Sequence, residues 1–187
     1  MNDPLALAAA VLAWFGAVVM VLSDARRGMA VGLVVLGSGL ALERAVAGQP
    51  VLATVILAGG LLAAVSSLRG SRARGWGLLA AGSTPRVVLC IVTGALALYF
   101  ARAVIEEPAD WQARAAILAV GVLGAARLLS ASDQRATLTA ASAVALALSL
   151  DVALVTPAAG LAVMITGAIF ATIISGLPSL GEAGADA

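Results

Sequence analysis

The stretch from Ser23 to Pro50 constrains this chain more than any other part of it. It contains a short charged turn, one apolar span, the acid and base Glu43 and Arg44, and a second turn that ends at the proline. Apolar segments of similar length lie on both sides, so the stretch can hardly fold in water. A bilayer core about 30 Å thick is crossed by about 20 residues of helix. We therefore expect this stretch to form the middle helix of a membrane-embedded helical hairpin.

The composition supports this interpretation and argues against several classes of site. Hydrophobic residues make up 62% of the 187 residues, charged residues make up 11%, and the mean hydropathy is +1.08. Soluble domains carry roughly 25% charged residues, so we expect an integral membrane protein. Histidine, the commonest metal ligand, is absent, and the single cysteine, Cys90, builds neither an intrachain disulfide nor a thiolate cluster. We expect no catalytic residues, no cofactor and no metal site.

Polar turns divide the chain into seven apolar segments, each close to the length of a membrane-spanning helix. We predict an all-α integral membrane protein with a single membrane domain, residues 1–187, and a flexible tail at 178–187. The first three-helix unit covers 4–68, a linking helix covers 87–105, and the second three-helix unit covers 113–177. The predicted spans are residues 4–22, 28–47, 51–68, 87–105, 113–130, 136–155 and 158–177.

A weak internal repeat relates the first three spans to the last three. The turns SDARR and SDQR each precede an apolar helix with an acid near its far end, Glu43 or Asp151, and a proline follows at Pro50 or Pro157. One extra helix separates the two units, so both units start on the same face of the membrane. We therefore predict a parallel 3+1+3 repeat.

The arginines are divided unevenly between the two ends of the predicted spans. All eleven basic residues are arginines, with eight on one side and three on the other. Short loops rich in arginine resist translocation, so we assign the richer side to the cytoplasm. This places the N-terminus outside and the C-terminus in the cytoplasm. The eight are Arg26, Arg27, Arg69, Arg72, Arg74, Arg86, Arg127 and Arg135, and the three are Arg44, Arg102 and Arg114.

Three residues are candidates for intramembrane or interfacial charges, namely Asp151, Glu43 and Arg44. Adjacent residues on a helix point about 100° apart, so we do not expect Glu43 and Arg44 to face each other as a pair. We interpret them as charges that reach the interface, with an intramembrane function as the alternative. Asp151 has apolar neighbours and no adjacent base, which makes it a functional candidate. Its helix ends a turn later, which equally favours an interfacial position.

Four residues are candidate contacts with lipid or with other subunits. Arg26 and Arg27 directly follow a span, and we interpret them as topology anchors, or alternatively as contacts with a neighbouring subunit or anionic lipid. Gly124 and Gly167 belong to small-residue runs, which let membrane helices approach closely. These runs predict tight packing against helices of this chain or of a partner. None has the context of a nucleotide-binding loop, and we expect no nucleic acid partner.

The order of these parts resembles the K subunit of respiratory complex I. The shared parts are one span, the cytoplasmic turn with the arginine pair, a second span, the Gly48-Gln49 turn and a third span. A 3+1+3 chain of this length is similar to component E of the hydrogenase-4 and formate hydrogenlyase type membrane arms. The resemblance implies a prokaryotic cytoplasmic membrane, and antiporter-like or hydrogenase/complex I-type subunits as partners. The K subunit carries glutamates deep in its second and third helices, whereas residues 31–38 and 51–66 here contain no acid, which implies a scaffold or adaptor.

Two functional classes fit these observations. The first is a non-catalytic membrane subunit of a larger ion-translocating or redox complex, favoured by the small size, the short loops and the lack of cofactor ligands. The alternative is a small membrane transporter or substrate-binding membrane component with a cavity between the two units. Such cavities usually have broken helices and polar residues near the midplane, which this sequence lacks. An enzyme is least favoured, because no constellation of nucleophile, base and oxyanion donor is present.

Overall fold

The computed structural model of the chain describes residues 4–68, 84–104, 111–131, 133–156 and 158–177. The helices in these residues are α1 (Pro4–Leu22), α2 (Arg26–Val46), α3 (Pro50–Leu68), α4 (Thr84–Val104), α5 (Trp111–Ser130), α6 (Gln134–Val155) and α7 (Gly160–Gly176). Six of them are long and apolar enough to cross a membrane, and α7, with 17 residues, is shorter. The chain is therefore an all-helical, multi-pass membrane protein.

The predicted spans agree with the helices to within a few residues at each end. The largest consequence concerns α2, which begins at Arg26 and not at residue 28, so the arginine pair lies in the first turn of the helix. Helix α7 begins at Gly160, two residues later than the predicted 158. At 1.5 Å per residue it is about 25 Å long, slightly less than the apolar core of a bilayer. The predicted tail, 178–187, lies outside the described residues.

The end of α2 follows from the properties of Gly48. Its φ of 77° lies in the left-handed region, which glycine adopts without a steric cost. The Gly48 N–H donates to the Ala45 carbonyl at 3.1 Å, and the Gln49 N–H donates to the Arg44 carbonyl at 2.9 Å. This is the hydrogen-bond pattern of a Schellman motif. Pro50 then begins α3, where proline is tolerated because its missing N–H would have no partner within the helix.

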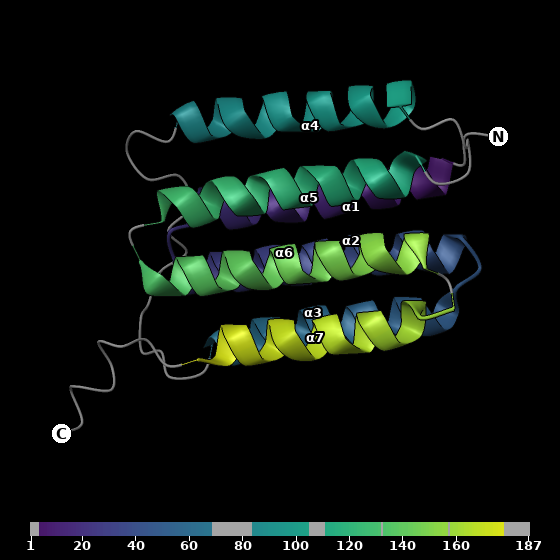
Figure 1. The fold of residues 1–187 in the computed structure, drawn as a ribbon. Helices are drawn as coiled ribbons and strands as arrows, with labels where there is room; N and C mark the ends of the chain where they lie inside the picture. The colour runs from purple at the N-terminus through teal and green to yellow at the C-terminus, as the bar shows by residue number, and fades with distance from the viewer. Residues whose placement is uncertain (1–3, 69–83, 105–110, 132, 157, 178–187) are drawn as a thin grey trace.

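The helices form two layers with one helix at the edge (Figure 1). One layer holds α1, α2 and α3, and the other holds α5, α6 and α7. Between the layers, α1 contacts α5, α2 contacts α6, and α3 contacts α7. The two members of each pair run in the same direction, while α4 stands at the edge against α5 and, over a smaller contact, α1. Both layers therefore begin at the same end of the bundle.

Small residues set the spacing between α1 and α2. A Cβ placed on Gly39 of α2 would meet the backbone of Ala13 in α1, and a Cβ placed on Gly16 of α1 would meet the backbone of Leu36. Small residues at such crossings let the two backbones approach, which is how helices associate when lipid tails are as apolar as their side chains. The core between the layers consists largely of alanine and leucine side chains. Helices α1 and α2 therefore form one closely packed unit.

Helix α4 is the least covered of the six long helices. Its apolar window is 22% buried, whereas the windows of the other five are 39 to 61% buried. Large apolar side chains such as Ile91, Tyr99 and Phe100 are exposed on it. This helix is therefore joined to the bundle along one side, and its remaining surface is suited to an apolar environment.

Candidate functional site

The charged side chains in the described part of the chain lie near the helix ends. One end of the bundle, the arginine-rich end, contains the α1–α2 connection, the start of α4 and the α5–α6 connection. The charged residues there are Asp24, Arg26, Arg27, Arg86, Arg127, Asp133 and Arg135. Those near the opposite end are Glu43, Arg44, Arg102, Arg114 and Asp151. The candidate sites are therefore two polar ends separated by a largely apolar middle.

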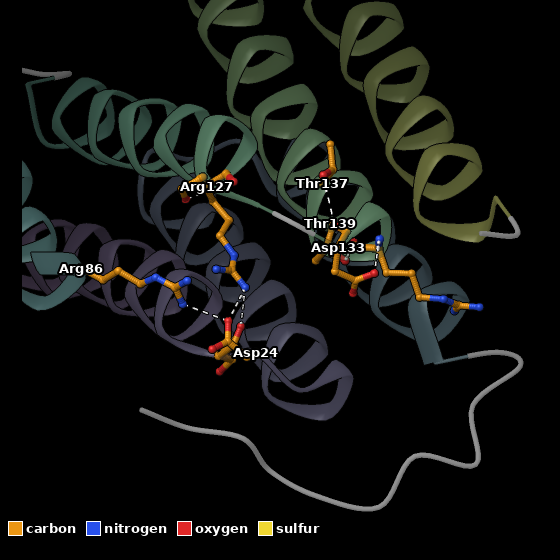
Figure 2. A network of polar contacts seen from close by, with 9 residues as sticks. Asp24, Arg86, Arg127, Asp133, Thr137 and Thr139 are labelled. Atoms are coloured by element: carbon orange, nitrogen blue, oxygen red, sulfur yellow. Dashed lines mark hydrogen bonds and ion pairs between the residues drawn. The ribbon is translucent and has the colours of Figure 1, made fainter. Parts of the chain in front are cut away.

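Three charged residues from different segments meet at the arginine-rich end (Figure 2). Asp24 Oδ1 accepts from Arg127 Nη2 and from Arg86 Nη1, both at 2.9 Å. Arg127 Nη2 also donates to the Ser23 carbonyl at 3.0 Å, and Arg127 is only 3% exposed. We call Asp24, Arg86 and Arg127 the arginine–aspartate cluster. This cluster ties the α1–α2 connection to the start of α4 and to the last turn of α5.

The arginines of this cluster set the charge state of Asp24. Burial raises the pKa of the Asp24 carboxyl, but the hydrogen bonds and positive charges of Arg127 and Arg86 outweigh burial and hold that pKa below its ordinary value. The carboxylate is therefore ionised at neutral pH. Sequence reasoning missed the cluster because Asp24 and Arg127 lie 103 residues apart. The signal that points to it is an acid in a short turn together with a base in the last turn of another span on the same side.

Asp133, also at the arginine-rich end of the bundle, has a different structural role from Asp24. Its carboxylate accepts from the Arg135 backbone N–H at 3.4 Å and so caps α6, and Thr137 Oγ1 donates to the Asp133 carbonyl at 3.2 Å (Figure 2). At the corresponding position before α2, Ala25 provides no side-chain cap. A polar hollow of about 190 Å³ is lined by Asp133 and the arginine–aspartate cluster. The aspartates of the SDARR and SDQR turns therefore do different work.

The two arginines that follow the first span separate in the structure. Arg27 is exposed, whereas Arg26 is half-buried and lines a small pocket together with Arg135. The hydroxyl-bearing residues that line the same pocket are Ser67, Thr139 and Ser175. Arg26 is therefore directed toward α3, α6 and α7 of its own chain. Arg27 offers the exposed side chain that a topology anchor or an external contact requires.

The expectation that Glu43 and Arg44 do not form a pair is wrong. Arg44 Nη2 donates to Glu43 Oε1 at 2.7 Å, and Arg44 Nε donates to Glu43 Oε2 at 2.9 Å. Arg44 and Glu43 are 1% and 4% exposed, so neither reaches the interface as a snorkelling charge. Their Cβ atoms diverge, but both side chains are long enough to bend together. Burial favours this bidentate pair because an isolated ion in a medium of low dielectric is costly.

Asp151 is half-buried and has a charged neighbour that the sequence did not reveal. It lines a groove between α4, α5 and α6 together with Arg114 of α5. In the part of the chain that the structure describes, neither side chain has a hydrogen-bond or ion-pair partner. The structure therefore places Asp151 in an open groove that a base also lines, which differs from the closed pair of Glu43 and Arg44.

Gly124 and Gly167 both pack against α6 of their own chain. A Cβ on Gly124 would come 2.5 Å from Val144 Cγ2, and a Cβ on Gly167 would overlap the Ser149 side chain. Both glycines are buried. Within the chain, their packing partner is therefore α6, and Gly167 also lines an open groove between α6 and α7.

Neither clustered metal ligands among the described residues nor similarity to known proteins indicates the chemistry of this chain. Among the described residues, no three His, Cys, Asp or Glu side chains gather where they would hold a metal ion. Cys90 is buried, and its carbonyl accepts from Trp14 Nε1 at 3.3 Å. No protein-family model, curated protein or solved structure matches this chain. The candidate sites therefore rest on the geometry of the chain itself.

Proposed function

We propose that the chain is a non-catalytic membrane subunit, a scaffold or adaptor, of a larger ion-translocating or redox membrane complex of the complex I or hydrogenase type. The observation that carries this proposal is the uncovered apolar surface of α4. Val88, Val92 and Tyr99 on this helix are 53, 46 and 67% exposed. A helix attached along one side presents a broad apolar surface to a second membrane subunit and loses none of its own packing when that subunit binds.

The arrangement of charges supports a structural role over a conducting one. Glu43 and Arg44 bind each other, and Arg127 is held by Asp24. A path for protons or ions requires ionisable or irregular polar groups near the middle of the bilayer. Here the middle of the described bundle contains hydroxyls such as Ser142, whose Oγ donates to helix carbonyls of Leu138 and Ala171. The Ser142 hydroxyl joins α6 to α7 and offers no titratable step.

We also propose that the two layers are a parallel repeat. Ser66 and Ser175 are 109 residues apart, and their Oγ atoms lie 2.5 Å from each other. Gly59 and Ala168 are separated by the same number, since 168 − 59 = 109, and they contact each other too. Equivalent residues meet in this way where two copies of one element pack around a two-fold axis. The same offset aligns the SDARR turn with the SDQR turn.

The orientation proposed for this chain has the arginine-rich end in the cytoplasm of a prokaryote and the N-terminus outside. The support is the division of arginines, eight against three. A reporter that is active only in the cytoplasm should work when fused after Ala187 and fail when inserted between Glu107 and Asp110. The reverse pattern would contradict the orientation, and a reporter that behaves alike at both sites would contradict the number of spans.

The test of the function is purification of the tagged chain in a mild detergent, with identification of the proteins that accompany it. We expect larger membrane proteins at fixed stoichiometry, and a severalfold loss of the chain when their genes are deleted, because a partner that binds only the folded state stabilises it. A chain that purifies alone, is monodisperse and moves a small solute in liposomes would replace this proposal with the transporter alternative.

Two variants locate the surface that the partner covers. Val92→Trp adds bulk on the outside of α4, and the matched control Ile173→Trp adds the same bulk to an exposed position on α7. We expect the first variant to lose the accompanying proteins and the second to keep them, with unchanged thermal unfolding of the isolated chain in both. Loss of the partners in the control alone would move the interface from α4 to α7.

A further inference from the structure

A groove open to the membrane runs along α4, α5 and α6 near the opposite end of the bundle. Its volume is about 710 Å³, and its lining is mostly apolar, with Leu96 and Phe100 from α4 and Val122 from α5. Phe100 and Val122 are 52% and 49% exposed. The described part of the chain therefore leaves this groove uncovered.

Two opposite charges stand in this groove without binding each other. Arg114 lies in the first turn of α5, and Asp151 lies near the end of α6. No hydrogen bond or ion pair of either side chain is present among the described residues, and the Nε of Arg114 is buried without an acceptor. Glu43 and Arg44, at the same end of the bundle, close on each other at 2.7 Å. An acid and a base that share a groove and remain apart fit a ligand that carries both charges.

The apolar part of the groove is long enough to hold part of a lipid chain. From Arg114 to Val122, α5 rises about 12 Å at 1.5 Å per residue, and the groove follows it along that length. A lipid chain gains little from leaving one apolar environment for another, because bilayer tails are as apolar as leucine. The selectivity of the groove therefore comes from the two charged groups at its end.

We propose that this groove binds a zwitterionic phospholipid with a primary ammonium headgroup. The phosphate contacts Arg114, whose forked N–H donors match phosphate oxygens, and the ammonium donates to the carboxylate of Asp151. One acyl chain lies along α5 toward Val122. A purely anionic headgroup would leave Asp151 facing like charge, and a quaternary ammonium has no N–H to donate to it. The inference stands independently of the proposed role as a subunit.

Native mass spectrometry of the purified chain tests this site. The protein is titrated separately with phosphatidylethanolamine, phosphatidylcholine and phosphatidylglycerol that carry the same acyl chains. We expect phosphatidylethanolamine to be retained about tenfold better than the other two, as for one additional charged hydrogen bond. Asp151→Asn should lower its retention to that of phosphatidylcholine, and Arg114→Gln should weaken both lipids.

Two further variants distinguish loss of the lipid-binding site from damage to the fold. Arg102→Gln removes an arginine at the same end that does not line the groove, since its guanidinium carbon lies 5.5 Å from the centre of the Trp111 ring. It should leave the lipid preference unchanged, and Asp151→Glu, which keeps a carboxylate, should retain the preference. Equal retention of the three lipids, a preference for phosphatidylglycerol, or unchanged retention in Asp151→Asn would overturn the proposal. So would a photo-crosslinker at Phe100 that captures protein and no lipid in native membranes.

Discussion

The two three-helix layers use similar acids in different ways. In the first layer, Asp24 binds Arg127 from the other layer, and Glu43 closes on its own neighbour. In the second layer, Asp133 caps its own helix, and Asp151 stays open in a groove. The first layer therefore uses its acids to fix helix positions, while the second layer keeps one acid accessible.

The difference follows from where a base is placed beside each acid. Arg44 follows Glu43 directly, whereas Val152 follows Asp151, so only the first acid finds a partner on its own helix. The two layers thus have a similar arrangement of helices, but only the first pairs its acid with a base on the same helix. This comparison predicts that equivalent substitutions in the two layers have unequal effects.

The largest effect is expected at the buried pair of the first layer. Arg44→Ala leaves the Glu43 carboxylate buried without this partner, which should lower the free energy of unfolding by about 3 to 5 kcal/mol. Asp151→Asn in the second layer should change it by less than about 0.5 kcal/mol, because its carboxylate is half-buried and has no protein partner among the described residues. Unfolding in denaturant of the chain reconstituted in phosphatidylcholine, which has no N–H to donate to Asp151, provides the measurement.

A double variant shows whether the fold needs the ion pair itself or only the absence of a single buried charge that has lost its partner. Glu43→Leu combined with Arg44→Leu removes both buried charges and should be neutral or stabilising, because the desolvation of both ions is avoided. If Arg44→Ala were as well tolerated as Asp151→Asn, the pair would not be the feature that distinguishes the two layers at this end.

The second largest effect on the free energy of unfolding is expected where the layers are joined at the arginine-rich end. Arg127→Ala removes the charged donor to Asp24 and to the Ser23 carbonyl, at an expected cost of about 1.5 to 3 kcal/mol. Arg27→Ala is the matched control, because this arginine is exposed, and its cost should stay below about 0.5 kcal/mol. Equal losses in the two variants would show that the cluster contributes through net charge and not through its contacts.

A smaller effect distinguishes the two aspartates of the SD turns. Asp133→Ala removes a helix cap and should cost about 1 kcal/mol, while Asp133→Ser should restore most of it because serine is also a good cap. Asp24→Ser should restore little relative to Asp24→Ala, since a hydroxyl does not replace the anion that Arg127 and Arg86 require. Hydrogen exchange in the first turn of α6 should respond to position 133 alone.

The backbone is far easier to predict than the side-chain contacts. The length of each apolar run and the turn at Gly48 locate the helices, because a bilayer requires about 20 residues and glycine accepts the left-handed conformation. The predicted start of α2 is too late because arginine fits both a turn and a first helical turn. The pairing of Glu43 with Arg44 depends on how long side chains bend, which spacing along a helix does not specify.

The sequence pattern does not predict contacts between segments that are distant along the chain. Asp24 and Arg127 have no common motif, and only the stacking of the layers brings them together. The same holds for Arg114 and Asp151, which line one groove because α5 and α6 are neighbours. The sequence indicates that Gly124 and Gly167 are packing residues, but only the structure shows that their partner is α6 of the same chain.

The smallest effect concerns pH and again separates the two layers. The pKa of Asp24 in the folded chain lies below its ordinary value of 3.8, so the stability that its ionisation provides is present above that value and is lost as the pH falls through the folded pKa. The difference in unfolding free energy between the wild type and Asp24→Asn should therefore be constant from neutral pH down to about pH 5, begin to fall near about pH 4 and disappear once the pH is below the folded pKa. The effect is small because the Asp24 side chain is 39% exposed and solvent screens it. Denaturant unfolding at a series of pH values measures it, with Asp133→Asn as the matched control. A difference that grows as the pH falls would contradict the assignment of Asp24 as the ionised partner of the two arginines.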